Sequence, residues 1–260
     1  MKFEKIRLQF THEERVARIT LASPKANILD RAMICELDAA LSQCTGRALK
    51  TIVLSADGQH FSFGASVQEH LPDQIAGTLQ SLHALLRQIY EAPAPVIAAV
   101  RGQCLGGGFE LALACDLIIT DKTAQFASPE IKLGVFAPAA SVLLPVRVGQ
   151  AVALRLLLTG VTLNAEEAAR SGLVTKVADD LDAEVESWLE SDFLPRSPSS
   201  LKLACRAARL PLRRVFEQDL PELESLYLRD LMATPDAEEG IRAFLEKRSP
   251  QWSKPVLAEG

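Results

Sequence analysis

The sequence lacks the features of a secreted, membrane or nucleic-acid-binding protein. Its 260 residues hold five cysteines, an odd number scattered in mostly apolar surroundings, which favours reduced thiols in a cytoplasmic protein. No apolar stretch approaches the roughly 18 residues of a membrane-spanning helix, and no signal-peptide pattern opens the chain. The net charge of -5 comes without long runs of one sign. We therefore expect no nucleic-acid partner and no membrane partner.

Several common catalytic signatures are also missing. The four histidines, His12, His60, His70 and His83, show no paired ligand spacing, so no metal site is predicted. The glycines have neither the G-x-G-x-x-G spacing nor a Gly-Lys-Ser/Thr triplet, which argues against a nucleotide site. The stretch 64–66 does not match the G-x-S-x-G elbow of serine hydrolases. These three classes of chemistry are left without a candidate site.

What the first 195 residues do contain is an alternation of short apolar strands and amphipathic helices. Asp30 is a candidate N-cap for the first helix, and the apolar, β-branched run at 51–56 is typical of a strand buried on both faces. Strand and helix alternating three times predict an α/β fold with mostly parallel strands. The expected helices are 30–41, 79–90 and 109–114, and the expected strands are 51–56, 96–100 and 117–120.

After residues 195–200 the pattern changes to helices alone. We place a boundary there, with a core at 1–195 and a helical region at 196–260. The expected helices are 201–210, 221–232 and 236–248, and the last carries an apolar stripe. A unit this small has little core of its own, so it is expected to pack on the main body or on another subunit.

The sharpest local feature is the run Gly102-Gln103-Cys104-Leu105-Gly106-Gly107-Gly108-Phe109-Glu110, between an apolar strand and an apolar helix. Three consecutive glycines allow close approach of the backbone. If they open the helix, their N–H groups lie at the positive end of its dipole and can hold a negatively charged oxygen. The alternative is a tight turn that binds nothing.

Two glutamates stand on either side of the strand at 117–120. Glu110 begins an apolar helix, and Glu130 follows Pro129 in an apolar segment. The two could converge at one end of the sheet, one holding a water as base while the other delivers a proton. Each also has a purely structural reading, as a carboxylate that stabilises the start of a helix. In the stretch 60–66, the backbone N–H of Gly64-Ala65 could join that of Gly107 in a two-donor oxyanion site.

Taken in order, four segments resemble the landmarks of the crotonase (enoyl-CoA hydratase) superfamily, over essentially the whole chain: 63–65, 102–110, 126–134 and 244–248. The resemblance implies an α/β spiral of ββα units with a C-terminal helical trimerisation region, assembled as a trimer or a dimer of trimers. It implies an acyl-CoA thioester as substrate, with no separate cofactor. The thioester oxygen would be polarised by the N–H groups of Ala65 and Gly107, and Glu110 and Glu130 match the acid/base pair of the family's hydratases.

The chain departs from the common family pattern after Glu130. Where many relatives have a glycine-rich loop, residues 135–141 include Phe136, Pro138 and three alanines, which predicts a rigid, apolar pocket wall suited to a compact ring. This run resembles that of the hydratases that convert cyclohexa-1,5-diene-1-carbonyl-CoA to 6-hydroxycyclohex-1-ene-1-carbonyl-CoA in anaerobic aromatic degradation. The alternatives are a short-chain enoyl-CoA hydratase acting on a linear substrate, a thioester isomerase or hydrolase, and a non-catalytic RNA-binding relative.

The resemblance also implies contacts with coenzyme A. Lys25 and Ala26, together with Gly64, Ser66 and Val67, are expected along its pantetheine and adenine portions. Ser66 stands where many relatives have an aspartate. Lys25 could equally be a solvated turn residue.

Overall fold

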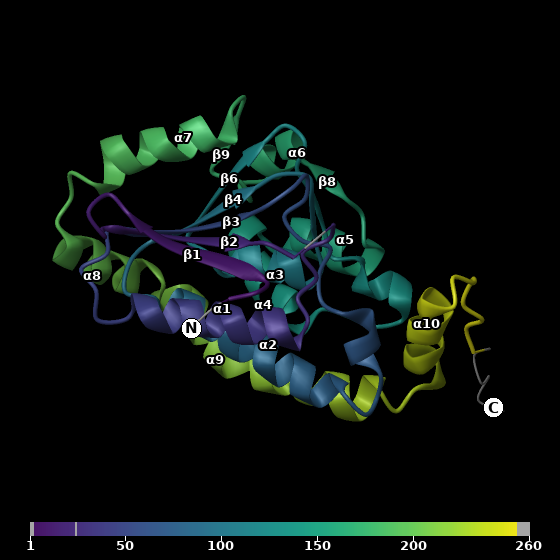
Figure 1. Ribbon diagram of the computed structural model, residues 1–260. Helices are drawn as coiled ribbons and strands as arrows, with labels where there is room; N and C mark the ends of the chain where they lie inside the picture. Colours follow the sequence, from purple (N-terminus) through teal and green to yellow (C-terminus); the bar gives the residue numbers. More distant parts are fainter. Residues whose placement is uncertain (1–2, 24, 254–260) are drawn as a thin grey trace.

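A six-stranded sheet lies at the centre of the computed structural model, which describes residues 3–23 and 25–253 (Figure 1). Its strand order is β1-β2-β3-β4-β6-β9, antiparallel between β1 and β2 and parallel elsewhere, as the alternating pattern predicts. A smaller sheet has the order β5-β7-β8. The strands are β1 (Ile6–Thr11), β2 (Val16–Leu21), β3 (Thr51–Ala56), β4 (Val96–Val100), β5 (Gln103–Leu105), β6 (Leu117–Asp121), β7 (Gln125–Ala127), β8 (Leu163–Asn164) and β9 (Lys176–Ala178).

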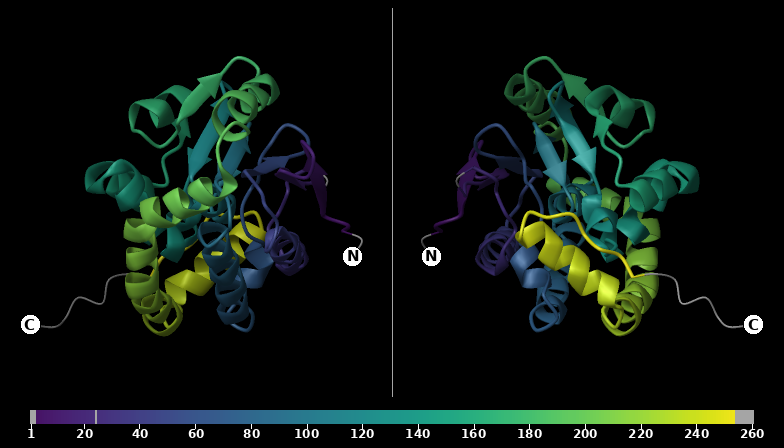
Figure 2. Two further views of the ribbon diagram at one scale, coloured as in Figure 1. Left: turned by 90° about the vertical axis from the view of Figure 1, so that its left-hand side faces the viewer. Right: turned by 90° about the vertical axis from the view of Figure 1, so that its right-hand side faces the viewer.

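Helices cover both faces of the large sheet (Figures 1 and 2). Alternate residues of a strand face opposite sides, and in β3 Ile52 and Leu54 pack in the main core while Val53 belongs to a second cluster that includes Leu181 and Val185. The helices are α1 (Arg31–Cys44), α2 (Ile75–Tyr90), α3 (Gly107–Ala114), α4 (Pro138–Val148), α5 (Gln150–Thr159), α6 (Ala165–Arg170), α7 (Leu181–Trp188), α8 (Pro198–Ala208), α9 (Leu210–Ser225) and α10 (Pro235–Leu245), with shorter helical turns η1 (Val67–His70), η2 (Pro129–Leu133), η3 (Leu189–Phe193) and η4 (Leu226–Leu231).

The predicted elements of the first 121 residues are present with small shifts of their ends. Asp30 caps α1 as predicted, because its side chain accepts a hydrogen bond of 2.9 Å from the N–H of Met33. Helix α2 begins four residues earlier than predicted, and α3 begins at Gly107, within the glycine run. The N–H groups of that run therefore do open a helix.

The prediction that a helix begins at Pro221 was wrong. Helix α9 starts at Leu210 and continues through Pro221 into η4. A proline inside a helix cannot donate to the carbonyl one turn before it. Phe216 and Leu220, buried in the main core just before the proline, and Tyr227, buried just after it, hold the helix in place on both sides.

One buried ion pair joins the C-terminal helices to the sheet. Arg209, at the junction of α8 and α9, donates 2.7 and 2.5 Å hydrogen bonds to both carboxylate oxygens of Asp116. The same guanidinium donates to the carbonyls of Tyr90, Ala92 and Ala94, just before β4, at 2.7–3.0 Å. The helices after residue 196 thus share a core with the rest of the chain, and the boundary at 195–200 stays a prediction.

Within the described residues, no helix combines the length and the apolar character needed to cross a membrane.

Candidate active site

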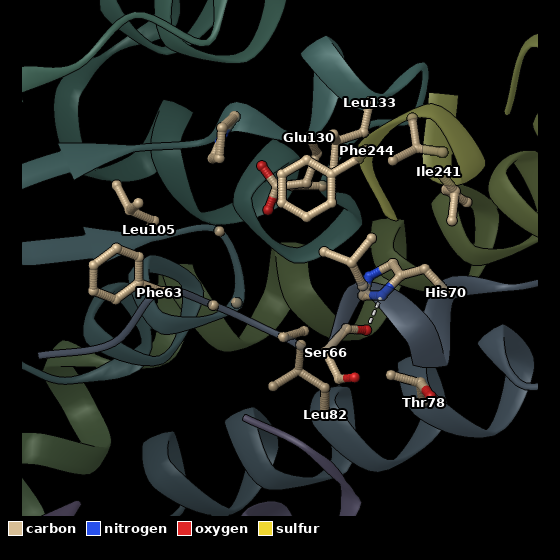
Figure 3. Close-up of a pocket in the computed structure, with 18 of the residues that line it drawn as sticks. Phe63, Ser66, His70, Thr78, Leu82, Leu105, Glu130, Leu133, Ile241 and Phe244 are labelled. Carbon is tan, nitrogen blue, oxygen red and sulfur yellow. Dashed lines mark hydrogen bonds between the residues drawn. The ribbon is translucent and has the colours of Figure 1, made fainter. Parts of the chain in front are cut away.

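A cavity of about 770 Å³ opens beside the glycine-rich turn (Figure 3). Its walls are mostly apolar. Segments far apart in the sequence meet there: the stretch after β3, the start of α3, η2 with the loop that follows it, and the C-terminal η4 and α10. The predicted site residues that line it are Ala26, Gly64, Ala65, Ser66, Val67, Gly107, Glu110, Glu130, Phe136 and Pro138. Lys25 is exposed and does not line the cavity.

Gly106 makes room for one of the two carboxylates. Its φ of +49° and ψ of -125° belong to a conformation that residues with a Cβ rarely adopt. A Cβ at this position would lie 2.6 Å from Oε1 of Glu130. The turn and the Glu130 side chain therefore touch, and the missing methyl is what allows them to.

The backbone N–H groups of Ala65 and Gly107 lie next to each other. A Cβ built on Gly107 would be 3.2 Å from the nitrogen of Ala65, and one built on Gly64 would be 3.4 Å from the nitrogen of Gly107. Gly107 is the first residue of α3, so its N–H is one of those that a helix leaves without an internal acceptor. Two adjacent donors, one at a helix N-terminus, suit an oxygen that gains negative charge.

The loop that carries Ala65 is held by buried side chains. Ser62 Oγ accepts a 3.0 Å hydrogen bond from the N–H of Gly64 and donates to the carbonyl of Asn27 at 2.7 Å. Asn27 in turn donates to the carbonyls of Asp57 and His60. These contacts link the 62–65 segment to the turn beside Ala26. The sequence pattern did not single out either Ser62 or Asn27.

Glu110 is almost fully enclosed. Its side chain lies in the first turn of α3, is 4% exposed, and accepts a 2.8 Å hydrogen bond from the N–H of Ala140 at the start of α4. Burial, and after it the charge of Glu130, raises the pKa of Glu110 to about 8, although the N–H groups of Ala140 and Ala139 act in the opposite direction. Near neutral pH this carboxyl group therefore holds a proton.

Glu130 also lines the cavity, from η2, directly after Pro129. Its Oε2 accepts a 2.7 Å hydrogen bond from Ser128 Oγ. Burial raises the pKa of Glu130 as well, while the Ser128 hydroxyl lowers it by stabilising the charged form. Two carboxyl groups that share an enclosed site do not both ionise readily, so the pair is suited to hold one proton between them. Such a pair provides an acid and a base to one water molecule.

Part of the cavity wall comes from the C-terminal elements η4 and α10. Tyr227 of η4 packs edge-on against Phe136, with ring centroids 5.3 Å apart. Ile241 and Phe244 of α10 also line the cavity, and both are labelled in Figure 3. The apolar stripe of the last predicted helix indicated that the α10 residues are buried against another part of the protein. No sequence pattern indicated a role for Tyr227, because no motif surrounds it.

In the described part of the chain, no group of three or more His, Cys, Asp or Glu side chains is placed to hold a metal ion. That the reaction needs no separate cofactor stays a prediction.

Comparisons with known proteins match this architecture and its sequence. Residues 11–255 match the family described as enoyl-CoA hydratase/isomerase. The chain is 50% identical over 236 residues to a cyclohexa-1,5-dienecarbonyl-CoA hydratase of Thauera aromatica, covering 90% of this chain and 92% of the relative. It is 34% identical to a 2,3-dehydroadipyl-CoA hydratase of Escherichia coli, covering 93% and 96%. The crystal structure of an enoyl-CoA hydratase from Mycobacterium avium superposes with a TM-score of 0.86 at 32% identity, covering 96% and 99%. The fold is the crotonase fold, and the chain belongs to the enoyl-CoA hydratase/isomerase family.

Proposed function

We propose that the protein is a hydro-lyase that adds water to cyclohexa-1,5-diene-1-carbonyl-CoA, giving 6-hydroxycyclohex-1-ene-1-carbonyl-CoA, in anaerobic aromatic degradation. The observation that carries this proposal is a pair of carboxyl groups with raised pKa values, Glu110 buried and Glu130 half-buried, in a mostly apolar cavity beside two adjacent N–H donors. The 50% identity to a cyclohexa-1,5-dienecarbonyl-CoA hydratase supports the choice of substrate.

In this proposal the thioester oxygen binds to the N–H groups of Ala65 and Gly107. Water attacks the ring carbon β to the thioester, its oxygen forms the new C–O bond, and one carboxylate accepts the released proton. The electron pair moves onto the thioester oxygen, which the two N–H groups stabilise as a dienolate. The other carboxyl group, protonated at the start, then protonates the distal ring carbon as the electrons return. One water is added, and no oxidant or reductant is needed.

The shape of the cavity favours a ring over a flexible chain. Phe136 is held edge-on by Tyr227, and Pro138 begins helix α4, so this wall is made of side chains with little freedom to move. Val135 beside them is buried. A rigid apolar wall fits a flat hydrocarbon ring without further ordering of the protein.

The test of this function is a comparison of kcat/KM for the cyclic dienoyl thioester and for crotonyl-CoA, with product analysis. We expect a preference for the cyclic substrate of at least about tenfold, which is the scale set by apolar pocket shape. A preference for crotonyl-CoA would favour the alternative, a short-chain enoyl-CoA hydratase that acts on linear substrates. The 34% identity to a 2,3-dehydroadipyl-CoA hydratase is the reason to test this alternative. Formation of an isomer or a free acid instead would point to an isomerase or a hydrolase.

A non-catalytic RNA-binding role is the remaining alternative. The net charge of -5 and the presence of both carboxylates argue against it. An RNA-binding assay titrated with salt is expected to show no association at about physiological ionic strength.

Coenzyme A is proposed to lie along Ala26, Gly64, Ser66 and Val67, which line the cavity on the side of the Ala65 N–H. Lys25 is exposed beside this stretch and would meet the coenzyme outside the cavity. A substrate thioester that lacks the adenine nucleotide tests the Lys25 contact separately from the contacts inside the cavity. Substitution of Lys25 by alanine is expected to raise KM for the intact CoA thioester and to leave KM for the truncated thioester unchanged.

We also propose a cytoplasmic homo-oligomer, a trimer or a dimer of trimers. Large apolar side chains at the surface support the assembly, among them Leu158, Leu203 and Leu210, each more than half exposed. All five cysteines are free, in keeping with a reducing compartment. Sedimentation analysis checks the assembly, and a monomer at micromolar concentration would contradict it.

A further inference from the structure

The cavity wall contains a buried hydroxyl group that has no partner. Tyr227 is 1% exposed, and its side-chain oxygen makes no hydrogen bond within the described residues. The rest of its ring is well accommodated, since it packs edge-on against Phe136 and lies in an apolar cluster with Ile75, Leu79 and Ile241. A hydroxyl group that is buried without a hydrogen-bond partner destabilises the folded protein. The position would be better filled by phenylalanine if the protein only had to fold.

The hydroxyl belongs to the same enclosed space as the acid/base pair. Tyr227 lines the cavity together with Glu110 and Glu130. Burial, and then the charges of these two carboxylates, raises the pKa of Tyr227. The phenol therefore keeps its proton at any physiological pH. It is a neutral group that both donates and accepts hydrogen bonds, beside carboxylates that change charge.

The proposed reaction leaves one partner for this hydroxyl. The ring of the substrate is a hydrocarbon and forms no hydrogen bond. The thioester oxygen is assigned to the N–H groups of Ala65 and Gly107. The attacking water and the hydroxyl group that it becomes are the remaining polar groups that enter this space.

We propose that Tyr227 is a further residue of the water-binding part of the active site, whose hydroxyl group hydrogen-bonds to the water held by Glu110 and Glu130 and to the ring hydroxyl of the product. The inference rests on the proposed hydratase function. It gives the C-terminal region a role in water positioning in addition to assembly. Because the contact involves the water and not the ring of the substrate, it stabilises the transition state and the product more than the bound diene.

The test uses the only other tyrosine of the sequence as a matched control. Tyr90 is also buried and packs edge-on against a phenylalanine, Phe216, with ring centroids 5.1 Å apart. It does not line the cavity. Tyr227→Phe is expected to lower kcat about three- to tenfold with KM little changed, the scale of one neutral hydrogen bond. Tyr90→Phe is expected to leave both constants unchanged, and neither variant is expected to lower Tm.

Ligand binding provides a readout that a structural role would not change. Tyr227→Phe is expected to weaken binding of 6-hydroxycyclohex-1-ene-1-carbonyl-CoA several-fold and to leave binding of cyclohex-1-ene-1-carbonyl-CoA, which lacks the hydroxyl, unaltered. Equal loss for both ligands, or a kcat within about twofold of the parent, would overturn the inference. If the unmodified protein hydrates neither cyclic nor linear thioesters, the proposed function fails first, and the binding ratio of the two ligands still decides the role of Tyr227.

Discussion

Two parts of the cavity lining differ in construction. The first, which we call the reactive wall, comprises residues 62–66, 105–110 and 128–140 and contains the carboxylates and the paired N–H groups. The second, the C-terminal wall, comprises Tyr227, Ile241, Phe244 and Leu245. The reactive wall is made of glycine turns, helix starts and polar groups with assigned partners. The C-terminal wall is made of apolar side chains and one unpaired hydroxyl.

The difference suggests that the reactive wall carries the groups that react and that the C-terminal wall mainly encloses the substrate. Groups that gain or lose charge during a reaction must be held in place beforehand, and in the reactive wall backbone hydrogen bonds and a missing Cβ do this. The apolar side chains of the C-terminal wall enclose the substrate pocket, for which packing is enough, and the Tyr227 hydroxyl is the one group of this wall to which a polar contact is assigned. Changes in the first wall are therefore expected to act on kcat, and changes in the apolar side chains of the second mainly on KM.

The largest effect is expected from removing either carboxylate. Glu110→Gln and Glu130→Gln are each expected to lower kcat about a hundredfold or more, the scale of general acid/base catalysis. Because the two act on one water, the double variant is expected to be little worse than either single variant. Steady-state kinetics on protein of confirmed fold checks this. Near-parental turnover in one single variant would remove that residue from the mechanism.

The reactive wall also predicts how stability depends on pH. The pKa of Glu110 is raised to about 8 from an ordinary value of 4.5, so the folded state holds a proton that the unfolded state releases. The free energy of unfolding is therefore expected to fall as pH rises from about 5 to about 8, by on the order of a few kcal/mol from this group.

Glu110→Gln removes this titration. The variant is expected to gain stability relative to the parent across the same pH range, as measured by urea unfolding. Parallel pH profiles for the two proteins would show that burial does not keep Glu110 protonated.

Gly106→Ala tests whether the missing methyl positions Glu130. The new Cβ would lie 2.6 Å from Oε1 of Glu130, so the carboxylate must move, and kcat is expected to fall at least about tenfold. Gly149→Ala is the matched control, since Gly149 also has a positive φ, of +75°, but a Cβ there would have nothing within 4 Å among the described residues. It is expected to lower Tm without changing kcat. Equal activity losses in the two variants would attribute the effect to backbone strain.

The smallest effect is expected from the C-terminal wall. Phe244 is 54% exposed at the edge of the cavity. Phe244→Ala is expected to raise KM about two- to fivefold with kcat nearly unchanged, because only part of the ring's apolar surface is available to the substrate. A fall in kcat as large as that expected for Gly106→Ala would contradict the claim that the apolar side chains of the C-terminal wall act mainly on KM.

The reactive wall could be predicted from the sequence because its residues stand in local patterns. The glycine run before Glu110 allows backbone conformations that other residues rarely adopt, and the proline before Glu130 restricts the backbone at its own position and at the residue before it. The strand and helix alternation likewise indicated the parallel sheet. These features depend on residues that are close together in the sequence, so they can be recognised without knowledge of the fold.

The C-terminal wall could not be predicted in the same way. Tyr227 reaches the cavity because α9 continues through Pro221, and that continuation depends on burial of Phe216 and Leu220 against distant helices. Lys25 is a different case, because it is exposed and lies outside the lining of the cavity, and its contact with coenzyme A stays a prediction. For Tyr227, packing between remote segments decides the position.

The ion pair between Arg209 and Asp116 bears on the order in which the protein folds during its synthesis. The two residues are 93 positions apart, and at about 5–20 residues per second Arg209 is made about 5–20 s after its partner. During that interval the carbonyls of Tyr90, Ala92 and Ala94 lack the guanidinium that they accept from in the finished protein. This end of strands β4 and β6 is therefore completed only after Arg209 has been made, and the residues of the C-terminal wall, Tyr227 to Leu245, follow later still.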